Sequence, residues 1–168
     1  MTNVEKYLTS VGKQVVSGAK SILKNSGKSG KLEKSITYEV VPVLDGFSLR
    51  FYMTDYGKFV DKGVSGNKKI QEYTTFDKRT IESPYKYTSK QPPADILAKW
   101  ISRKKIKGRD KKTGRFITNL SLAYIFAKKI KRDGLKSLSF FQKPLGEAWK
   151  NFEVDLAEAL KKDITDKL

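Results

Sequence analysis

The most informative segment of this chain reads Gly134-Leu135-Lys136-Ser137-Leu138-Ser139-Phe140-Phe141. It lies between an apolar pattern of helical spacing over residues 120–130 and an amphipathic pattern that runs almost to the end of the chain. A Gly break followed by two adjacent Phe residues favours a short extended segment. Because paired aromatic rings on such a segment are costly to leave in water, we expect Phe140 and Phe141 to enter this chain's core or that of a neighbour.

Helices are predicted on both sides of this segment. Upstream, the four-residue spacing of Leu122, Phe126 and Ile130 predicts a helix over residues 119–133. Downstream, a last helix is predicted from residue 143 or 145 to about residue 165, because an apolar stripe is opposed there by charged residues. The stripe consists of Leu145, Ala148, Trp149, Phe152, Leu156, Ala159 and Leu160.

The N-terminal third predicts one helix and one hairpin. Apolar residues at three- and four-residue spacing indicate a helix over residues 2–25, and residues 26–30 are interpreted as a flexible connector. Alternating patterns over residues 35–43 and 47–54 predict two antiparallel strands. The Asp45-Gly46 pair between them is a strong hairpin signal, since Gly there tolerates the backbone of a tight turn.

The middle of the chain has weaker signals. Residues 55–63 are interpreted as a strand-end turn with buried aromatic rings, and residues 63–93 lose periodicity and predict a long loop. Within that loop, residues 71–76 favour a strand. A helix is expected from about residue 95 to 105, followed by a basic loop over residues 107–115.

Together these patterns predict an α+β fold in a single domain over residues 1–168. A small antiparallel sheet is packed by an N-terminal and a C-terminal helix, with a long loop at 63–93 and a basic helix-and-loop insertion at 94–115. A chain of 168 residues is long enough for a real core. Nine Phe, eight Tyr and two Trp argue against wholesale disorder.

The composition narrows the classes of function. There are 35 basic and 18 acidic residues, a net charge of 35 − 18 = +17, which favours polyanions or acidic protein surfaces as partners. The absence of Cys excludes disulfides and thiolate chemistry. The absence of His removes the commonest acid–base group at neutral pH and the commonest metal ligand.

The remaining acidic residues give no sign of an active site. They are scattered along the chain, and none lies in a recognisable metal-binding pattern. We therefore expect no enzymatic activity, no cofactor and no metal. No apolar run approaches the roughly 20 residues that span a bilayer, and the N-terminus lacks the order of a signal peptide. We expect the protein to be made and kept in a cytoplasm, or in something assembled there.

The most cationic stretch covers residues 99–115, where Asp110 alone offsets the positive charge. Such a run can contact DNA phosphates, pair with an acidic protein surface, or be a simply solvated loop. Nothing in the pattern indicates reading of base edges. The candidate contact residues are Arg103, Lys104, Lys105, Lys107, Arg109, Lys111, Lys112 and Arg115.

The order of these segments resembles that of the head–tail joining and tail-completion (neck) proteins of tailed bacteriophages. The resemblance depends on Tyr56-Gly57-Lys58-Phe59-Val60-Asp61-Lys62-Gly63 after the second strand, on Gly114-Arg115-Phe116-Ile117, and on Phe140-Phe141 before the closing helix. In that family the first block usually reads Tyr-x-x-x-Val-Glu-x-Gly-Thr. Here Val64 replaces the usual Thr, and the region from residue 63 to 115 is enlarged.

The resemblance implies a structural virion protein without catalytic residues, assembled in the host cytoplasm. Six or twelve copies would form a ring between portal and tail, as a connector ring, stopper or tail terminator. The implied partners are copies of the chain, adjacent portal or connector and tail proteins, and packaged DNA in the channel, with no membrane. The implied signature and interface residues are Tyr56, Phe59, Val60, Gly63, Phe140 and Phe141. The alternative, supported by net charge alone, is a free, non-specific nucleic-acid-binding module.

Overall fold

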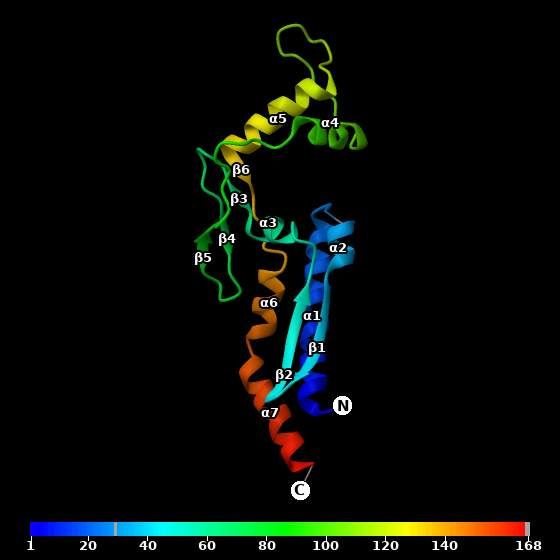
Figure 1. Ribbon diagram of the computed structural model, residues 1–168, viewed down its shortest axis with the longest axis vertical. Coiled ribbons are helices and arrows are strands. Elements are labelled where there is room, and N and C mark those ends of the chain that lie inside the picture. Colours follow the sequence, from blue (N-terminus) through cyan, green and yellow to red (C-terminus); the bar gives the residue numbers. More distant parts are fainter. Residues whose placement is uncertain (29, 167–168) are drawn as a thin grey trace. The chain divides into compact units, whose positions relative to one another are not determined.

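The computed structural model describes residues 1–28 and 30–166, and this part of the chain is an α+β structure (Figure 1). Over those residues it contains seven helices and three two-stranded sheets. The predicted fold class, a small antiparallel sheet packed by N- and C-terminal helices, is confirmed. Of the connector predicted over residues 26–30, Ser29 lies outside the described residues.

The chain divides into two compact units. The first unit comprises residues 1–61, 73–81 and 138–168, and the second unit comprises residues 62–72 and 82–137. The single domain expected over residues 1–168 stays a prediction, because units of this kind are defined by contacts and a domain by independent folding.

The first unit is organised around the long helix α1 (Asn3–Asn25). Its buried face carries Leu8, Val15, Ala19 and Leu23, which follow the three- and four-residue spacing seen in the sequence. At its start the Thr2 hydroxyl accepts a hydrogen bond from the Glu5 amide at 3.1 Å, so a free N–H of the first turn is satisfied. The predicted N-terminal helix is confirmed.

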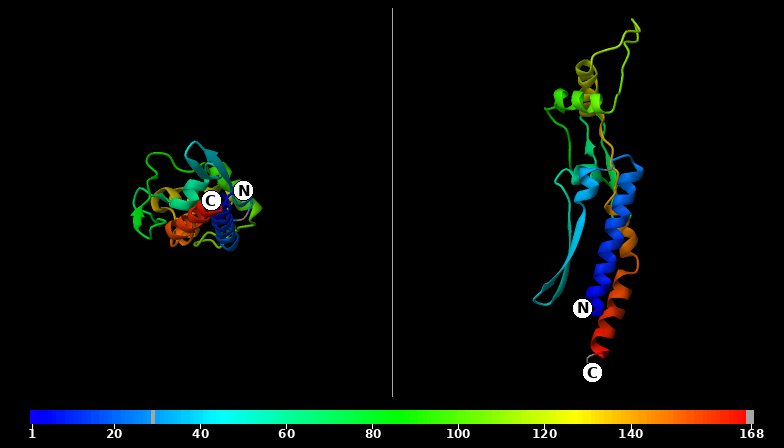
Figure 2. Two further views of the ribbon diagram at one scale, coloured as in Figure 1. Left: turned by 90° about the horizontal axis from the view of Figure 1, so that it is seen from below. Right: turned by 90° about the vertical axis from the view of Figure 1, so that its right-hand side faces the viewer.

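The predicted hairpin is also present, as β1 (Thr37–Val43) and β2 (Gly46–Tyr52). The strands are antiparallel, and Val43 pairs with Gly46 beside the turn. Helix α1 packs against β1, and at Gly12 an added Cβ would collide with the Tyr38 ring. Towards its tip the hairpin diverges from α1, as the right view of Figure 2 shows.

Two short helices were not predicted from the sequence. Residues 31–35, just after the predicted connector, form α2 (Lys31–Ser35), in which the Ser35 hydroxyl donates to the Leu32 carbonyl at 2.7 Å. The strand-end turn predicted over residues 55–63 is wrong, because that segment contains α3 (Gly57–Lys62). The Tyr56 carbonyl accepts the first hydrogen bonds of α3, from the amides of Phe59 and Val60 at 3.1 and 3.3 Å.

The closing helix is broken in two, where one continuous helix was predicted. It consists of α6 (Gln142–Trp149) and α7 (Phe152–Thr165), both of which pack against α1. Asn151, with φ −115° and ψ 11°, leaves the helical conformation between them. The break lets the rings of Trp149 and Phe152 stack almost parallel, with centroids 4.5 Å apart. Aromatic stacking of this kind stabilises the junction of the two helices.

The core of the first unit is built around Phe140, whose side chain is fully buried. Its neighbours come from α1, α2 and the strand entry, so the short segment before α6 closes the core. The buried members of this cluster are Val16, Ala19, Leu23, Leu32, Ile36 and Phe140.

The second unit contains a helix pair and a small sheet. Helix α4 (Ala94–Arg103) packs against α5 (Asn119–Asp133) through a cluster that includes Ile101 and Ala123, both fully buried. The predicted helix over residues 119–133 is confirmed, and Thr118 caps it by accepting from the Ser121 amide at 3.2 Å.

The long loop predicted over residues 63–93 is interrupted by short strands. It contains β3 (Val64–Ser65), β4 (Glu72–Thr74) and β5 (Thr80–Glu82). Strand β3 pairs with β6 (Gly134–Leu135), and Ser65 also exchanges backbone hydrogen bonds of 2.8 Å with Tyr85 and Tyr87. Strands of two or three residues are too short for a visible alternation, which is why periodicity fails. The strand favoured over residues 71–76 is confirmed by β4.

Candidate interaction surfaces

Two of the three segments that carried the resemblance, those with Asp61 and with Phe140-Phe141, meet in the first unit. The buried Asp61 carboxylate accepts hydrogen bonds from the amides of Phe141, at 2.8 Å, and Gln142, at 3.4 Å. The Asp61 carbonyl accepts from the Ser139 amide at 2.9 Å, and the Val60 carbonyl from the Leu138 amide at 3.0 Å. Asp61 therefore holds the start of α6. Sequence reasoning did not single out Asp61, although an acidic residue directly after Phe59-Val60 was a usable signal.

The signature residues differ in their surroundings. Phe140 is fully buried within its own chain, which is the first of the two places expected for it. Phe141 is half-buried and meets Phe51 edge to face, with ring centroids 5.2 Å apart. Val60 packs against the Phe140 core, whereas Tyr56 and Phe59 remain 43% and 37% exposed.

Gly63 lies in the second unit and has a structural role. Its φ of +72° favours glycine, and an added Cβ would lie 2.7 Å from the Ser137 amide nitrogen. Of the six signature residues, only Tyr56 and Phe59 are therefore classed as exposed.

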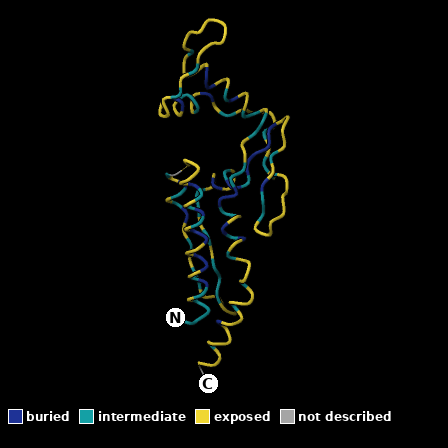
Figure 3. Tube along the Cα trace, turned by 180° about the vertical axis from the view of Figure 1, so that it is seen from behind, coloured by how far each residue is buried: buried dark blue, intermediate teal, exposed yellow. Residues whose placement is uncertain are grey.

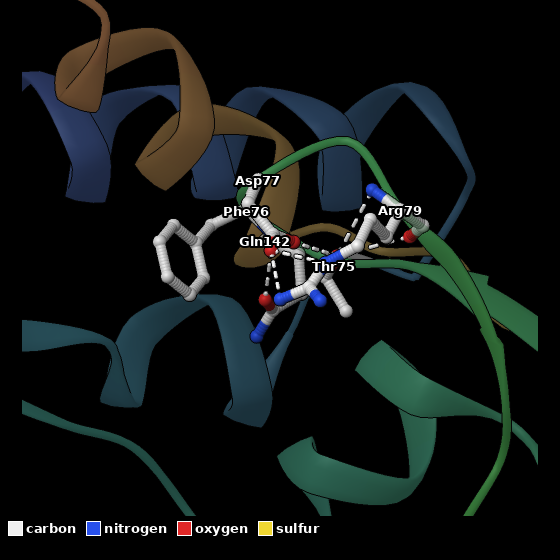
Figure 4. Close-up of polar contacts among 5 residues, drawn as sticks. All are labelled: Thr75, Phe76, Asp77, Arg79 and Gln142. Atoms are coloured by element: carbon white, nitrogen blue, oxygen red, sulfur yellow. Dashed lines mark hydrogen bonds and ion pairs between the residues drawn. The ribbon is translucent and has the colours of Figure 1, made fainter.

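The turn between β4 and β5 is anchored on α6 (Figure 4). The Phe76 amide donates to the Gln142 side-chain oxygen at 3.1 Å, and the Phe76 ring meets Trp149 edge to face at 5.9 Å. Asp77 bonds to Thr75 and Arg79, and the Thr75 hydroxyl is the main cause that lowers the pKa of its carboxyl. These exposed polar contacts stabilise the turn.

An apolar groove opens between α1, β2, α6 and α7 of the first unit. It has a volume of about 900 Å³ and is bounded at its polar edge by Asp45 and Asp163. Trp149, Leu160 and Ile164 line it and are 46%, 53% and 57% exposed. The apolar stripe predicted for the closing helix is thus only partly covered. The apolar lining consists of Val4, Leu8, Val11, Phe47, Leu49, Phe51, Leu145, Trp149, Phe152, Leu156, Leu160 and Ile164.

The cationic stretch forms a second surface, which we call the basic ribbon (residues 103–117). All eight basic residues predicted to contact a partner are exposed, and the ribbon is open along most of its length (Figure 3). Its backbone is a hairpin: Arg109 bridges Phe116, the Asp110 amide donates to the Arg115 carbonyl at 2.9 Å, and the Ile117 amide to Gly108 at 3.0 Å. The predicted basic loop is thus closed at its base by one isolated β-bridge.

Asp110 organises the tip of the ribbon. Its carboxylate accepts from the amides of Lys112 and Thr113, at 2.9 and 2.8 Å, and from the Thr113 hydroxyl at 3.1 Å. These hydrogen bonds lower the pKa of the Asp110 carboxyl, and the bond from the Thr113 amide has the largest effect. The turn ends at Gly114, whose φ of +68° suits glycine. The acidic residue inside the cationic run thus shapes the backbone, and its single negative charge is outnumbered by the eight cations of the ribbon.

The ribbon also carries Phe116, which was not among the contact residues predicted from the sequence. Its ring is 61% exposed. The Arg109 guanidinium carbon lies 4.4 Å from the ring centroid and the Lys107 ammonium 5.7 Å from it. A large apolar ring flanked by two cations suits a ligand that carries negative charge and also has a flat or apolar face.

Charge is distributed unequally between the two units. The second unit has 19 Lys and Arg against five Asp and Glu, a net charge of 19 − 5 = +14. The first unit has 16 against 13, a net charge of 16 − 13 = +3. Most of the surplus thus belongs to the unit that carries the basic ribbon.

Within the part of the chain that the structure describes, no group of three or more Asp or Glu side chains is arranged to hold a metal ion. None of the described helices combines the length and apolarity of a membrane span. Compared with known protein families, with curated proteins and with solved structures, the chain matches none of them.

Proposed function

We propose that this protein is a structural, non-catalytic subunit of the head–tail joining region of a tailed bacteriophage, and that identical copies assemble side by side in a ring. The observation that carries this proposal is the apolar groove of the first unit. Soluble monomers rarely leave a contiguous apolar surface of this kind in water. The groove's exposed Trp149, Leu160 and Ile164 therefore require a cover.

The cover we propose is part of a second copy of this chain. The lining of the groove includes two carboxylates, Asp45 and Asp163, and no Lys or Arg, so the polar edge of the groove is acidic. Outside the basic ribbon, the second unit still has 11 Lys and Arg against four Asp and Glu, a net charge of 11 − 4 = +7, and this part is the complementary surface that every copy offers. A contact between two different surfaces of the same chain is heterologous. Repeating it closes a ring when the rotation that relates neighbouring copies is a whole-number fraction of a full turn.

The resemblance supplies the biological setting. Its two main blocks, which are far apart in the chain, join through the buried Asp61. The contact supports the view that the two blocks form one structural feature of the proposed family. In the proposed setting the ring lies between portal and tail in the virion, with portal or connector and tail proteins as neighbours.

The role of the groove in assembly can be tested by introducing one charged side chain into it. Leu160→Lys would place an ammonium group in the apolar contact, so we expect the dissociation constant of the oligomer to rise at least about tenfold. Mass measurement in solution and negative-stain imaging provide the readout: rings for the unaltered chain and smaller species for the variant. Because Leu160 is 53% exposed, the fold should survive, which circular dichroism checks.

The matched control is Val154→Lys. Val154 is 64% exposed on the same helix but does not line the groove. It should therefore leave the oligomer intact. A chain that stays monomeric at high concentration, or oligomers that tolerate both substitutions equally, would contradict the proposed ring contact.

A non-specific nucleic-acid-binding module is the second candidate function. The observation that favours it is the concentration of net charge in the second unit, and especially in the basic ribbon. Salt-sensitive DNA binding by a chain that stays monomeric would favour this candidate over the ring.

A further inference from the structure

We infer that the basic ribbon binds duplex DNA through its phosphates, without reading the base sequence, and that Phe116 adds an apolar contact to this binding. DNA binding by the ribbon depends on the second unit alone, so it does not require the proposed ring.

The cations of the ribbon are available to a ligand. Among residues 1–28 and 30–166, no carboxylate forms an ion pair with any of the eight basic residues. The Asp110 carboxylate lies in their midst but accepts three hydrogen bonds from the turn. Eight like charges within residues 103–115 repel one another, and a polyanion would relieve that repulsion while releasing its own counterions.

The shape of the ribbon suits a duplex. The major groove of DNA admits a narrow two-stranded hairpin. Backbone hydrogen bonds and one isolated β-bridge between Arg109 and Phe116 draw residues 108–117 into a hairpin loop. Lys111 and Lys112 lie at the tip, and Arg109 and Arg115 lie on the two arms of this loop, so cations can reach phosphates on both walls of a groove.

The presence of a single exposed aromatic ring, Phe116, favours duplex over single-stranded DNA as the ligand. Binding of single strands generally uses several aromatic rings on which successive bases stack. The ribbon offers one ring, 61% exposed and flanked by Lys107 and Arg109. One ring can cover a sugar or a base edge beside two phosphates. Most of the affinity would then come from charge, and a duplex has a higher charge density than a single strand.

The composition of the ribbon argues against an acidic protein as its ligand. Five of the eight cations are lysines: Lys104, Lys105, Lys107, Lys111 and Lys112. Lysine is depleted in protein–protein interfaces, whereas arginine and aromatic residues are enriched there. Compact ammonium groups on flexible stems are, in contrast, well suited to phosphates that need no fixed angle of approach.

The test is a salt titration with the full chain. Fluorescence anisotropy measures binding to a labelled DNA duplex and to a second duplex of unrelated sequence. With about five phosphate contacts, affinity should fall about 500-fold between about 50 and 200 mM salt, with equal values for both sequences. A nearly flat salt dependence, or a strong preference for one duplex, would overturn the inference.

Variants locate the contact. Lys111→Gln, Lys112→Gln and Arg115→Gln together should lower the slope of log affinity against log salt by about 2–3. The matched control replaces three exposed lysines of the first unit, Lys13, Lys24 and Lys28, with Gln, and removes the same charge. If this control lowers the slope as much, bulk charge and not the ribbon binds DNA.

Phe116→Ala should weaken binding about threefold to tenfold and leave the slope unchanged, because it removes no charge. An unchanged affinity would overturn the role of the ring. Two competitors decide the class of ligand. Polyglutamate that competes as well as duplex DNA would indicate an acidic protein partner, and single-stranded DNA that binds more tightly would exclude the duplex as the preferred ligand.

Discussion

Phe140→Ala is expected to lower the free energy of unfolding by about 3–5 kcal/mol. The Phe140 side chain is fully buried, in contact with a cluster that includes Leu23, Leu32 and Ile36. Truncation removes the transfer free energy of the ring and leaves a cavity, because residues from α1, α2 and the strand entry cannot all move to fill it. Denaturant unfolding monitored by circular dichroism provides the measurement.

The control for this substitution is Phe116→Ala. Phe116 has the same side chain but is 61% exposed, so its truncation should change the free energy of unfolding by no more than about 0.5 kcal/mol. Equal losses for the two variants would mean that Phe140 is not the centre of a packed core. Phe140→Ala should also weaken the proposed oligomer, since the groove belongs to the same unit as this core.

Asp61→Ala is expected to destabilise the first unit by about 2–3 kcal/mol. The substitution leaves the amides of Phe141 and Gln142 without the carboxylate that accepts from them, at a position where the Asp61 side chain is only 3% exposed. A partly buried N–H without an acceptor loses its hydrogen bond to water and gains nothing in exchange. The same unfolding experiment measures the loss.

Two further variants distinguish the hydrogen bonds from the charge. Asp61→Asn keeps a side-chain oxygen that can accept from the Phe141 amide, so we expect a smaller loss, of about 1 kcal/mol. Asp55→Ala removes an exposed carboxylate just before α3 and should be almost neutral. A loss for Asp55→Ala as large as that for Asp61→Ala would show that net charge near α3, and not the contact with α6, stabilises this region.

These predictions and those for the two surfaces test different properties of the molecule. Phe140 and Asp61 concern the stability of the first unit, Leu160 the assembly of copies, and the basic ribbon the binding of DNA. Leu160→Lys and the ribbon variants alter exposed side chains, so they should change assembly or binding without unfolding the chain.

Local sequence was sufficient to predict α1, α5 and the β1–β2 hairpin. Each is marked by neighbours in the chain: helical spacing of apolar residues, a Thr2 or Thr118 cap, and an Asp45-Gly46 turn. The exposed cations of the basic ribbon could also be foreseen, because a run so poor in apolar residues has little to bury.

Tertiary contacts decided what local sequence left open. Phe140, Phe141 and Phe116 are the same residue type, yet one is fully buried, one half-buried and one exposed. Burial depends on which distant segments supply neighbours, and no periodicity in a short segment encodes that choice. The same holds for the two-residue pairing of β3 with β6 and for the acceptor that Asp61 offers to α6. Short-range propensities determined where helices and turns form, whereas close packing between segments far apart in the chain determined which side chains remain free to meet a partner.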